Sequence, residues 1–224
     1  MIDLYTWTTP NGRKVSILLE ELGVEYEAHA INITKDEQFA PEFLKIAPNN
    51  RIPAIVDRDT DTTLMESGAI MLYLAEKHGR FLPGGVDRWP AIEWLMWQMG
   101  GLGPMAGQAH HFLKYAPSME PPNDLPYAKD RYRNEVNRLH GVLNKRLAQS
   151  EYVAGPEFTI ADMAIWPWAH LWKRQEQDLS DKPHFARWIE TVGSRPAVQR
   201  GRALHGELRK AEPDKSAQDL LFKR

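Results

Sequence analysis

Cysteine is absent from this chain of 224 residues. Its absence excludes a disulfide framework, a thiolate nucleophile and a cysteine metal site, so any thiol chemistry must use a thiol that a substrate brings. Long apolar runs are also missing, and none approaches the ~20 residues that cross a membrane. The first residues, MIDLYTWTTPNG, have neither the basic region nor the apolar core of a secretory signal, so we expect a cytoplasmic protein.

A strong charge imbalance is missing too. The formal net charge is −2, which favours neither nucleic acid nor an anionic membrane surface as a partner. Hydrophobic residues make up 42% of the chain and charged residues 26%, as in an ordinary globular protein. The length allows one or two domains of roughly 100–200 residues each.

The first 80 residues alternate between strand and helix patterns. Residues 2–7 alternate apolar and polar side chains, residues 14–22 show helical spacing that ends at Gly23, and residues 25–33 alternate again. This unit predicts a parallel crossover. A short helix at 39–46, strands at 52–56 and 63–65, and a helix at 66–78 complete a β-α-β-α-β-β-α order.

The rest of the chain contains no convincing strand pattern. We therefore predict an α/β domain over residues 1–80, a linker over 81–87, and an all-α domain over 88–224 whose last ~12 residues are mobile. The predicted helices are 89–115, bent at Gly100–Pro104, then 127–149, 159–173 and 183–192.

Three short motifs suggest where chemistry could occur. The first is Ile52-Pro53 at a strand start, where a proline cannot donate to the sheet. A cis bond would turn the Ile52 backbone outward, free to pair with an extended peptide. Only about 5–6% of such bonds are cis, so an ordinary trans proline is favoured from this motif alone.

The second motif is Glu66-Ser67-Gly68 at the start of a helix. The N–H groups and dipole of a helix N-terminus suit a carboxylate, and Glu66 could bind an ammonium group. Together they would fit the zwitterionic head of an amino acid. A capping residue with an acidic neighbour is the favoured alternative for this segment by itself.

The third motif is Thr159-Ile160-Ala161-Asp162. Thr159 and Asp162 have the spacing of a capping box, with Asp in place of the usual Glu. We therefore interpret Asp162 as structural and not as a catalytic acid.

The order of these motifs resembles the cytosolic glutathione transferase superfamily over nearly the whole chain. The resemblance to its bacterial Nu class is carried by the stretches YTWTTPNGRK (5–14), PNNRIPAIVD (48–57), ESGAIMLYLAE (66–76), WQMGGLGPMAGQAHHF (97–112) and TIADMAIWPW (159–168). It implies a thioredoxin-like glutathione-binding domain followed by a helical domain with the second-substrate surface. It also implies a homodimer that reduces small disulfides with glutathione as co-substrate and only weakly conjugates electrophiles.

The resemblance also implies a set of glutathione-binding residues. Glu66 and Ser67 would hold the γ-glutamyl head, and the backbone of Ile52, before a cis Pro53, would pair with the cysteinyl part. The remaining candidates are Gln38, Asn50 and Arg51 near the glycyl end, and Arg131 in the helical domain.

The residue that faces the glutathione sulfur is the remaining question. By the same resemblance we expect Thr9 and Asn11 to be the catalytic pair, since a hydroxyl and an amide N–H can donate to a thiolate and lower the thiol pKa. Ordinary turn and cap roles are the alternatives for both. For Tyr5, core packing is the favoured interpretation.

Two other functions fit the same sequence features. A broad transferase that conjugates glutathione to electrophiles, or a non-catalytic glutathione-binding regulatory module, could use the same fold. No metal is expected: His110 and His111 point about 100° apart on a helix and lack further ligands at suitable spacing.

Overall fold

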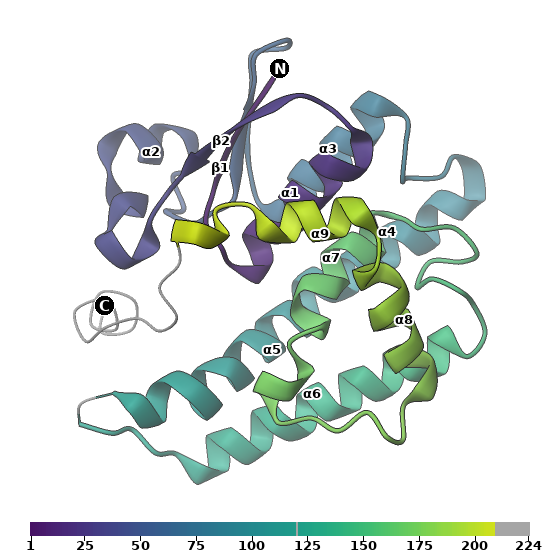
Figure 1. Cartoon of the computed structure of the whole chain (residues 1–224). Coiled ribbons are helices and arrows are strands. Elements are labelled where there is room, and N and C mark those ends of the chain that lie inside the picture. The colour runs from purple at the N-terminus through teal and green to yellow at the C-terminus, as the bar shows by residue number, and fades with distance from the viewer. Residues whose placement is uncertain (120, 209–224) are drawn as a thin grey trace. The chain divides into compact units, whose positions relative to one another are not determined.

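The computed structural model describes residues 1–119 and 121–208 and divides them into two compact units (Figure 1). Of these described residues, the first unit contains 1–80 and 196–208, and the second contains 81–119 and 121–195. The helices and strands of the first unit are β1 (Ile2–Thr6), α1 (Pro10–Leu22), β2 (Tyr26–Ala30), α2 (Pro41–Ile46), β3 (Ala54–Asp57), β4 (Thr62–Met65), α3 (Ser67–His78) and α9 (Pro196–Ala203).

The four strands form one mixed sheet in the order β2-β1-β3-β4. Strands β1 and β2 are parallel, which confirms the predicted crossover, and the pairings β1–β3 and β3–β4 are antiparallel. Leu4 and Ile55 face each other across β1 and β3 and are fully buried. The sheet thus forms the core of the α/β unit that the sequence predicts.

Helix α1 begins at Pro10, four residues earlier than the apolar spacing predicts. Thr9 caps it, because its Oγ1 accepts a hydrogen bond of 3.2 Å from the Gly12 N–H, and a proline suits the first helical position. Gly12 is required here: a Cβ would lie 2.4 Å from the Trp7 carbonyl oxygen. The close contact between Gly12 and the Trp7 carbonyl places the first turn of α1 beside the end of β1.

Helix α2 packs against β3 and β4 through a small apolar cluster. Phe43, Ala47 and Ala54 are its buried members, and Ile52 and Met65 pack against them. The two segments that precede β3 and follow β4 are thereby anchored to the core.

The last α-helix of the described residues, α9, belongs to the first unit and packs on α1. Gly201 allows close contact, since a Cβ there would lie 2.6 Å from the Ile17 backbone. The Ser16 hydroxyl donates to the Gly201 carbonyl over 2.7 Å, and Arg200 pairs with Glu20. The sequence had placed α9 in the predicted all-α domain over residues 88–224. The mobility expected for the last ~12 residues concerns positions outside the described residues.

Helices are the only regular secondary structure among the described residues of the second unit, 81–119 and 121–195, and loops connect them. Its long helices are α4 (Arg88–Trp97), α5 (Gly103–His110), α6 (Pro126–Leu147), α7 (Ile160–Ala169) and α8 (Pro183–Gly193). The wider π turns Gln98–Leu102 and His111–Tyr115 interrupt the predicted helix 89–115. The first of them accommodates Pro104, which cannot donate a helical hydrogen bond.

A buried network at the start of α7 confirms the predicted capping box. Asp162 is fully buried and accepts hydrogen bonds from the backbone N–H groups of Val153 and Thr159, each at 3.0 Å, and from Trp188 Nε1 at 2.9 Å. The residue therefore joins a loop, a helix start and α8, and its role is structural. Within the described residues, no helix is long and apolar enough to cross a membrane.

Candidate functional site

A pocket of about 280 Å³ lies in the first unit, at the start of β3, the end of β4 and the starts of α1 and α3. Six of the ten residues predicted for the site line it, together with two that were not predicted. The lining residues are Asn11, Asn49, Arg51, Ile52, Pro53, Met65, Glu66 and Ser67.

The Ile52–Pro53 peptide bond is cis, as the resemblance implies. Pro53 is buried directly before β3, and Ile52 is half-buried and packs against the α2 cluster. The core therefore holds this segment in place while both residues line the pocket.

The adjoining wall is the N-terminus of α3, because Met65 at the end of β4 pairs with Ala54, the residue after Pro53. Ser67 is the first helical residue and is buried, and Glu66 precedes it as an exposed side chain. The N–H groups at a helix N-terminus and the positive end of the helix dipole favour an anion, whereas the Glu66 carboxylate favours a cation. Opposite charges of one ligand can thus be bound side by side.

The backbone of Glu66 is strained, with φ 70° and ψ 112°. A residue other than glycine in such a conformation costs about 1–3 kcal/mol, and strain of this kind concentrates at functional sites. The strain therefore supports a binding role for this residue over a simple capping role.

The two predicted catalytic residues flank the start of α1. Asn11 lines the pocket, whereas Thr9 is half-buried and is not among the lining residues. The Thr9 oxygen accepts the capping hydrogen bond from Gly12, which leaves the hydroxyl hydrogen able to donate elsewhere. The geometry thus allows one side chain to serve both the cap and a ligand.

The remaining predicted residues differ in their positions. Arg51 is exposed at the pocket, and Asn50, with φ 49°, lies in the turn just before it. Gln38 is 4% exposed, does not line the pocket, and its Oε1 has no hydrogen-bond partner among the described residues. Arg131 is exposed on α6 of the other unit. The roles of these residues stay predictions.

Two lining residues were missed in the sequence. Asn49 belongs to the same turn as Asn50, and Met65 directly precedes Glu66. Each was one residue away from a predicted position, so the available signal was proximity to the motifs.

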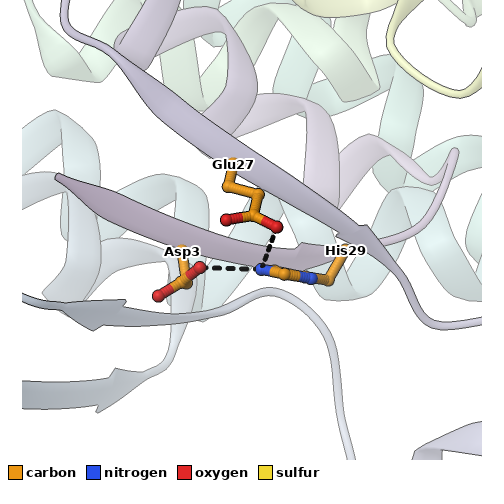
Figure 2. Close-up of side chains that lie close together, drawn as sticks. All are labelled: Asp3, Glu27 and His29. Carbon is orange, nitrogen blue, oxygen red and sulfur yellow. Dashed lines mark hydrogen bonds and ion pairs between the residues drawn. The ribbon is translucent and has the colours of Figure 1, made fainter.

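A cluster of carboxylates and a histidine lies elsewhere in this unit (Figure 2). His29 Nε2 is 2.7 Å from Asp3 Oδ1 and 3.9 Å from Glu27 Oε1. Arg58 binds Asp3 through two nitrogens and Glu27 at 2.7 Å, and it holds the pKa of Asp3 below its usual value. Since the guanidinium already pairs with both carboxylates, we interpret the cluster as a cross-strand ion-pair network.

Tyr5 extends this network into the core. Its ring stacks on His29 with centroids 4.7 Å apart and also packs near Phe43. Burial is the main cause that raises the Tyr5 pKa above its ordinary value. These contacts agree with the core-packing role favoured from the sequence.

Aromatic side chains of the second unit pair on α4 and between the π segment His111–Tyr115 and α6. The rings of Trp94 and Trp97 meet edge to face at 5.1 Å, and Phe112 stacks on Tyr132 at 5.3 Å. Burial lowers the pKa of His111, which favours its neutral form. Packing accounts for these contacts.

Comparison with known proteins agrees with both units. The glutathione S-transferase N-terminal domain family matches residues 1–76, and the C-terminal domain family of the same name matches residues 104–196. The disulfide-bond oxidoreductase YfcG of Escherichia coli is 49% identical over 91% of this chain and 94% of its own length.

Solved structures show the same similarity. A glutathione transferase family member from Pseudomonas fluorescens with two bound glutathiones has a TM-score of 0.84 and 43% identity, covering 90% of this chain and 92% of its own. One from Pseudomonas putida with one glutathione disulfide per subunit has a TM-score of 0.83 and 41% identity, covering 90% of both chains. The chain belongs to the glutathione S-transferase family.

Proposed function

We propose that this protein is a glutathione-dependent disulfide-bond reductase that acts on small disulfides. The observation that carries the proposal is the pocket in the thioredoxin-like unit, where a helix N-terminus and the Glu66 carboxylate lie beside the cis Ile52–Pro53 segment. A relative of 49% identity named a disulfide-bond oxidoreductase supports the choice of reaction. The absence of cysteine is consistent with a mechanism in which all reacting thiols come from glutathione.

In this proposal the pocket binds glutathione in extended form. Glu66 accepts a hydrogen bond from the α-amino group of the γ-glutamyl head, and Ser67 and the α3 N–H groups donate to its carboxylate. The Ile52 backbone pairs with the cysteinyl residue. Gln38, Asn50, Arg51 and Arg131 are the proposed contacts of the glycyl end and the outer part of the ligand.

Thr9 and Asn11 then stabilise the sulfur as a thiolate. The Thr9 hydroxyl and the Asn11 amide donate hydrogen bonds to the negative sulfur, which lowers the thiol pKa from about 8.5 and raises the nucleophilic fraction at neutral pH. The thiolate attacks one sulfur of the substrate disulfide. A mixed disulfide with glutathione forms, and the other half leaves as a thiolate that takes up a proton.

A second glutathione completes the reaction. Its thiolate attacks the glutathione sulfur of the mixed disulfide, forms glutathione disulfide and releases the second substrate thiol. Two glutathiones are thereby oxidised and one disulfide is reduced to two thiols. The relatives crystallised with two glutathiones or with glutathione disulfide support this two-thiol scheme.

A homodimer is part of the proposal. Trp89 and Met96 lie seven residues apart on α4 and are 66% and 48% exposed, and Val86 just before the helix is 81% exposed. Apolar side chains gathered in this way are typical of a protein interface. Light scattering that gives the mass of one 25.7 kDa chain would contradict the dimer.

We place the reaction in the cytoplasm, because a reductase that consumes reduced glutathione needs a compartment that regenerates it. The second candidate reaction is conjugation of glutathione to electrophiles. The glutathione S-transferase family assignment supports this alternative, since conjugation requires the same activated thiolate.

One paired assay separates the candidates. Reduction of 2-hydroxyethyl disulfide by glutathione, coupled to glutathione reductase, is run beside conjugation of an aryl halide. We expect high turnover in the first and low turnover in the second. The reverse result would make conjugation the main activity, and bound glutathione without turnover in either assay would favour a regulatory module.

A further inference from the structure

Lys14 is a buried cation in the first unit that the proposed mechanism does not use. It is 2% exposed and lies on α1, whose other buried side chains are mostly apolar. Burying an ammonium group costs several kcal/mol unless nearby charges or hydrogen bonds offset the cost. A methionine would fill a similar volume at this position without that cost.

The position of Lys14 connects it to the pocket. It lies three residues after Asn11, which lines the pocket, and residues at this spacing share one side of a helix. Helix α1 packs against α3, which begins directly after Glu66. Burial lowers the Lys14 pKa to about 7, and the negative charge of Glu66 acts in the opposite direction and raises it.

We propose that Lys14 is a positioning residue of the glutathione site, whose buried ammonium group orients the Glu66 carboxylate toward the γ-glutamyl amino group of glutathione. This inference rests on the proposed function, because it assigns Glu66 to the γ-glutamyl head. A carboxylate has about four acceptor positions and can interact with both ammonium groups at once. An oriented carboxylate loses less side-chain entropy when the ligand binds.

The test is a double-mutant cycle on glutathione affinity, measured by calorimetric titration at pH 6.5, below the pKa of Lys14. The variants are Lys14→Met, Glu66→Gln and the double variant. Lys14→Gln serves as a second charge-removing variant if methionine prevents folding. We expect Lys14→Met to weaken binding about 5- to 30-fold in the wild-type background and less than about 2-fold when Glu66 is already glutamine.

Two further variants separate positioning from general stability. Lys182→Met removes a lysine of the second unit that is equally hidden, at 4% exposed, and should leave affinity within about 2-fold. Lys14→Arg keeps the charge and should recover part of the lost affinity. In steady-state reductase assays, the Lys14→Met loss should fall mainly on the KM for glutathione.

The outcomes are distinguishable. If the wild-type protein binds no glutathione, the proposed function fails and this inference fails with it. If the wild-type protein binds glutathione but the Lys14 and Glu66 effects simply add, or Lys14→Met binds as well as the wild type, the proposed function stands and the positioning role of Lys14 is refuted.

Discussion

Replacing Thr9 with alanine tests the proposed chemistry most directly. The side chain has one structural contact that the substitution removes, the 3.2 Å capping hydrogen bond from the Gly12 N–H to Oγ1. Loss of a threonine cap costs about 1 kcal/mol of unfolding free energy. In a chain of this size, that cost lowers Tm by roughly 2–4 °C, so the variant should remain folded.

The effect on turnover should be larger. A hydrogen bond to a charged group contributes about 1.5–3 kcal/mol. If Thr9 donates to the thiolate in the transition state, alanine should slow disulfide reduction about 10- to 150-fold. Glutathione affinity should change little, because Glu66, Ser67 and the Ile52 backbone make the main proposed contacts.

The assay is the coupled reduction of 2-hydroxyethyl disulfide, with glutathione affinity measured in parallel. Thr9→Ser is the matched control, because it keeps both the cap and the hydroxyl and should retain most of the activity. Wild-type turnover of Thr9→Ala in both the reductase and the conjugation assays would remove Thr9 from the mechanism.

Three other substitutions test the fold and its charges. Asp162→Ala leaves three buried donors unpaired and should cost about 3–5 kcal/mol in urea unfolding, while Asp130→Ala on the exposed face of α6 should stay within about 0.5 kcal/mol. Gly201→Ala should destabilise by about 1–3 kcal/mol because its Cβ would meet the α1 backbone, whereas Gly141→Ala, with nothing within 4 Å, should not; equal unfolding midpoints would contradict the close packing. The Lys14 pKa is about 7 in the folded chain and 10.5 in the unfolded chain, so the unfolded state binds this proton more tightly. The free energy of unfolding should therefore rise from pH 7 to pH 10.5, and this gain should be lost as the pH falls through 7. The same rise in a Lys14→Met variant would refute this assignment.

Patterns in the sequence predicted the first unit well where local chemistry determines the structure. The alternation of residues 2–7 predicted β1, and Gly23 ends α1 in the left-handed conformation that favours glycine. The start of α1 was misplaced, because Pro10 and Asn11 resemble a turn when Thr9 is not recognised as the cap. Capping signals and turn signals use the same residues, so periodicity alone cannot separate them.

The residues of the candidate site could be predicted where a family motif contains them, and less well elsewhere. The motifs alone favoured a trans proline and a plain helix cap. The family resemblance assigned Glu66, Ser67, Ile52 and Pro53 to the site, and all four line one pocket. Lys14 could not be singled out. A lysine in an amphipathic pattern normally reaches solvent, and only the packing of neighbouring helices on α1 buries it.

The packing of α9 on α1, in the unit formed mainly by the first 80 residues, has a consequence for synthesis of the chain. The first unit cannot complete its core when residue 80 has been made, because the helix that covers α1 ends at Ala203, 123 residues later. At a synthesis rate of ~5–20 residues per second, α1 would lack its α9 contact for about 6–25 s after residue 80 has been added. A nascent chain stopped before Pro196 would therefore leave uncovered the face of α1 on which α9 packs. Loss of the last residues from Pro196 onward should thus affect the first unit, although those residues lie far from it in the sequence.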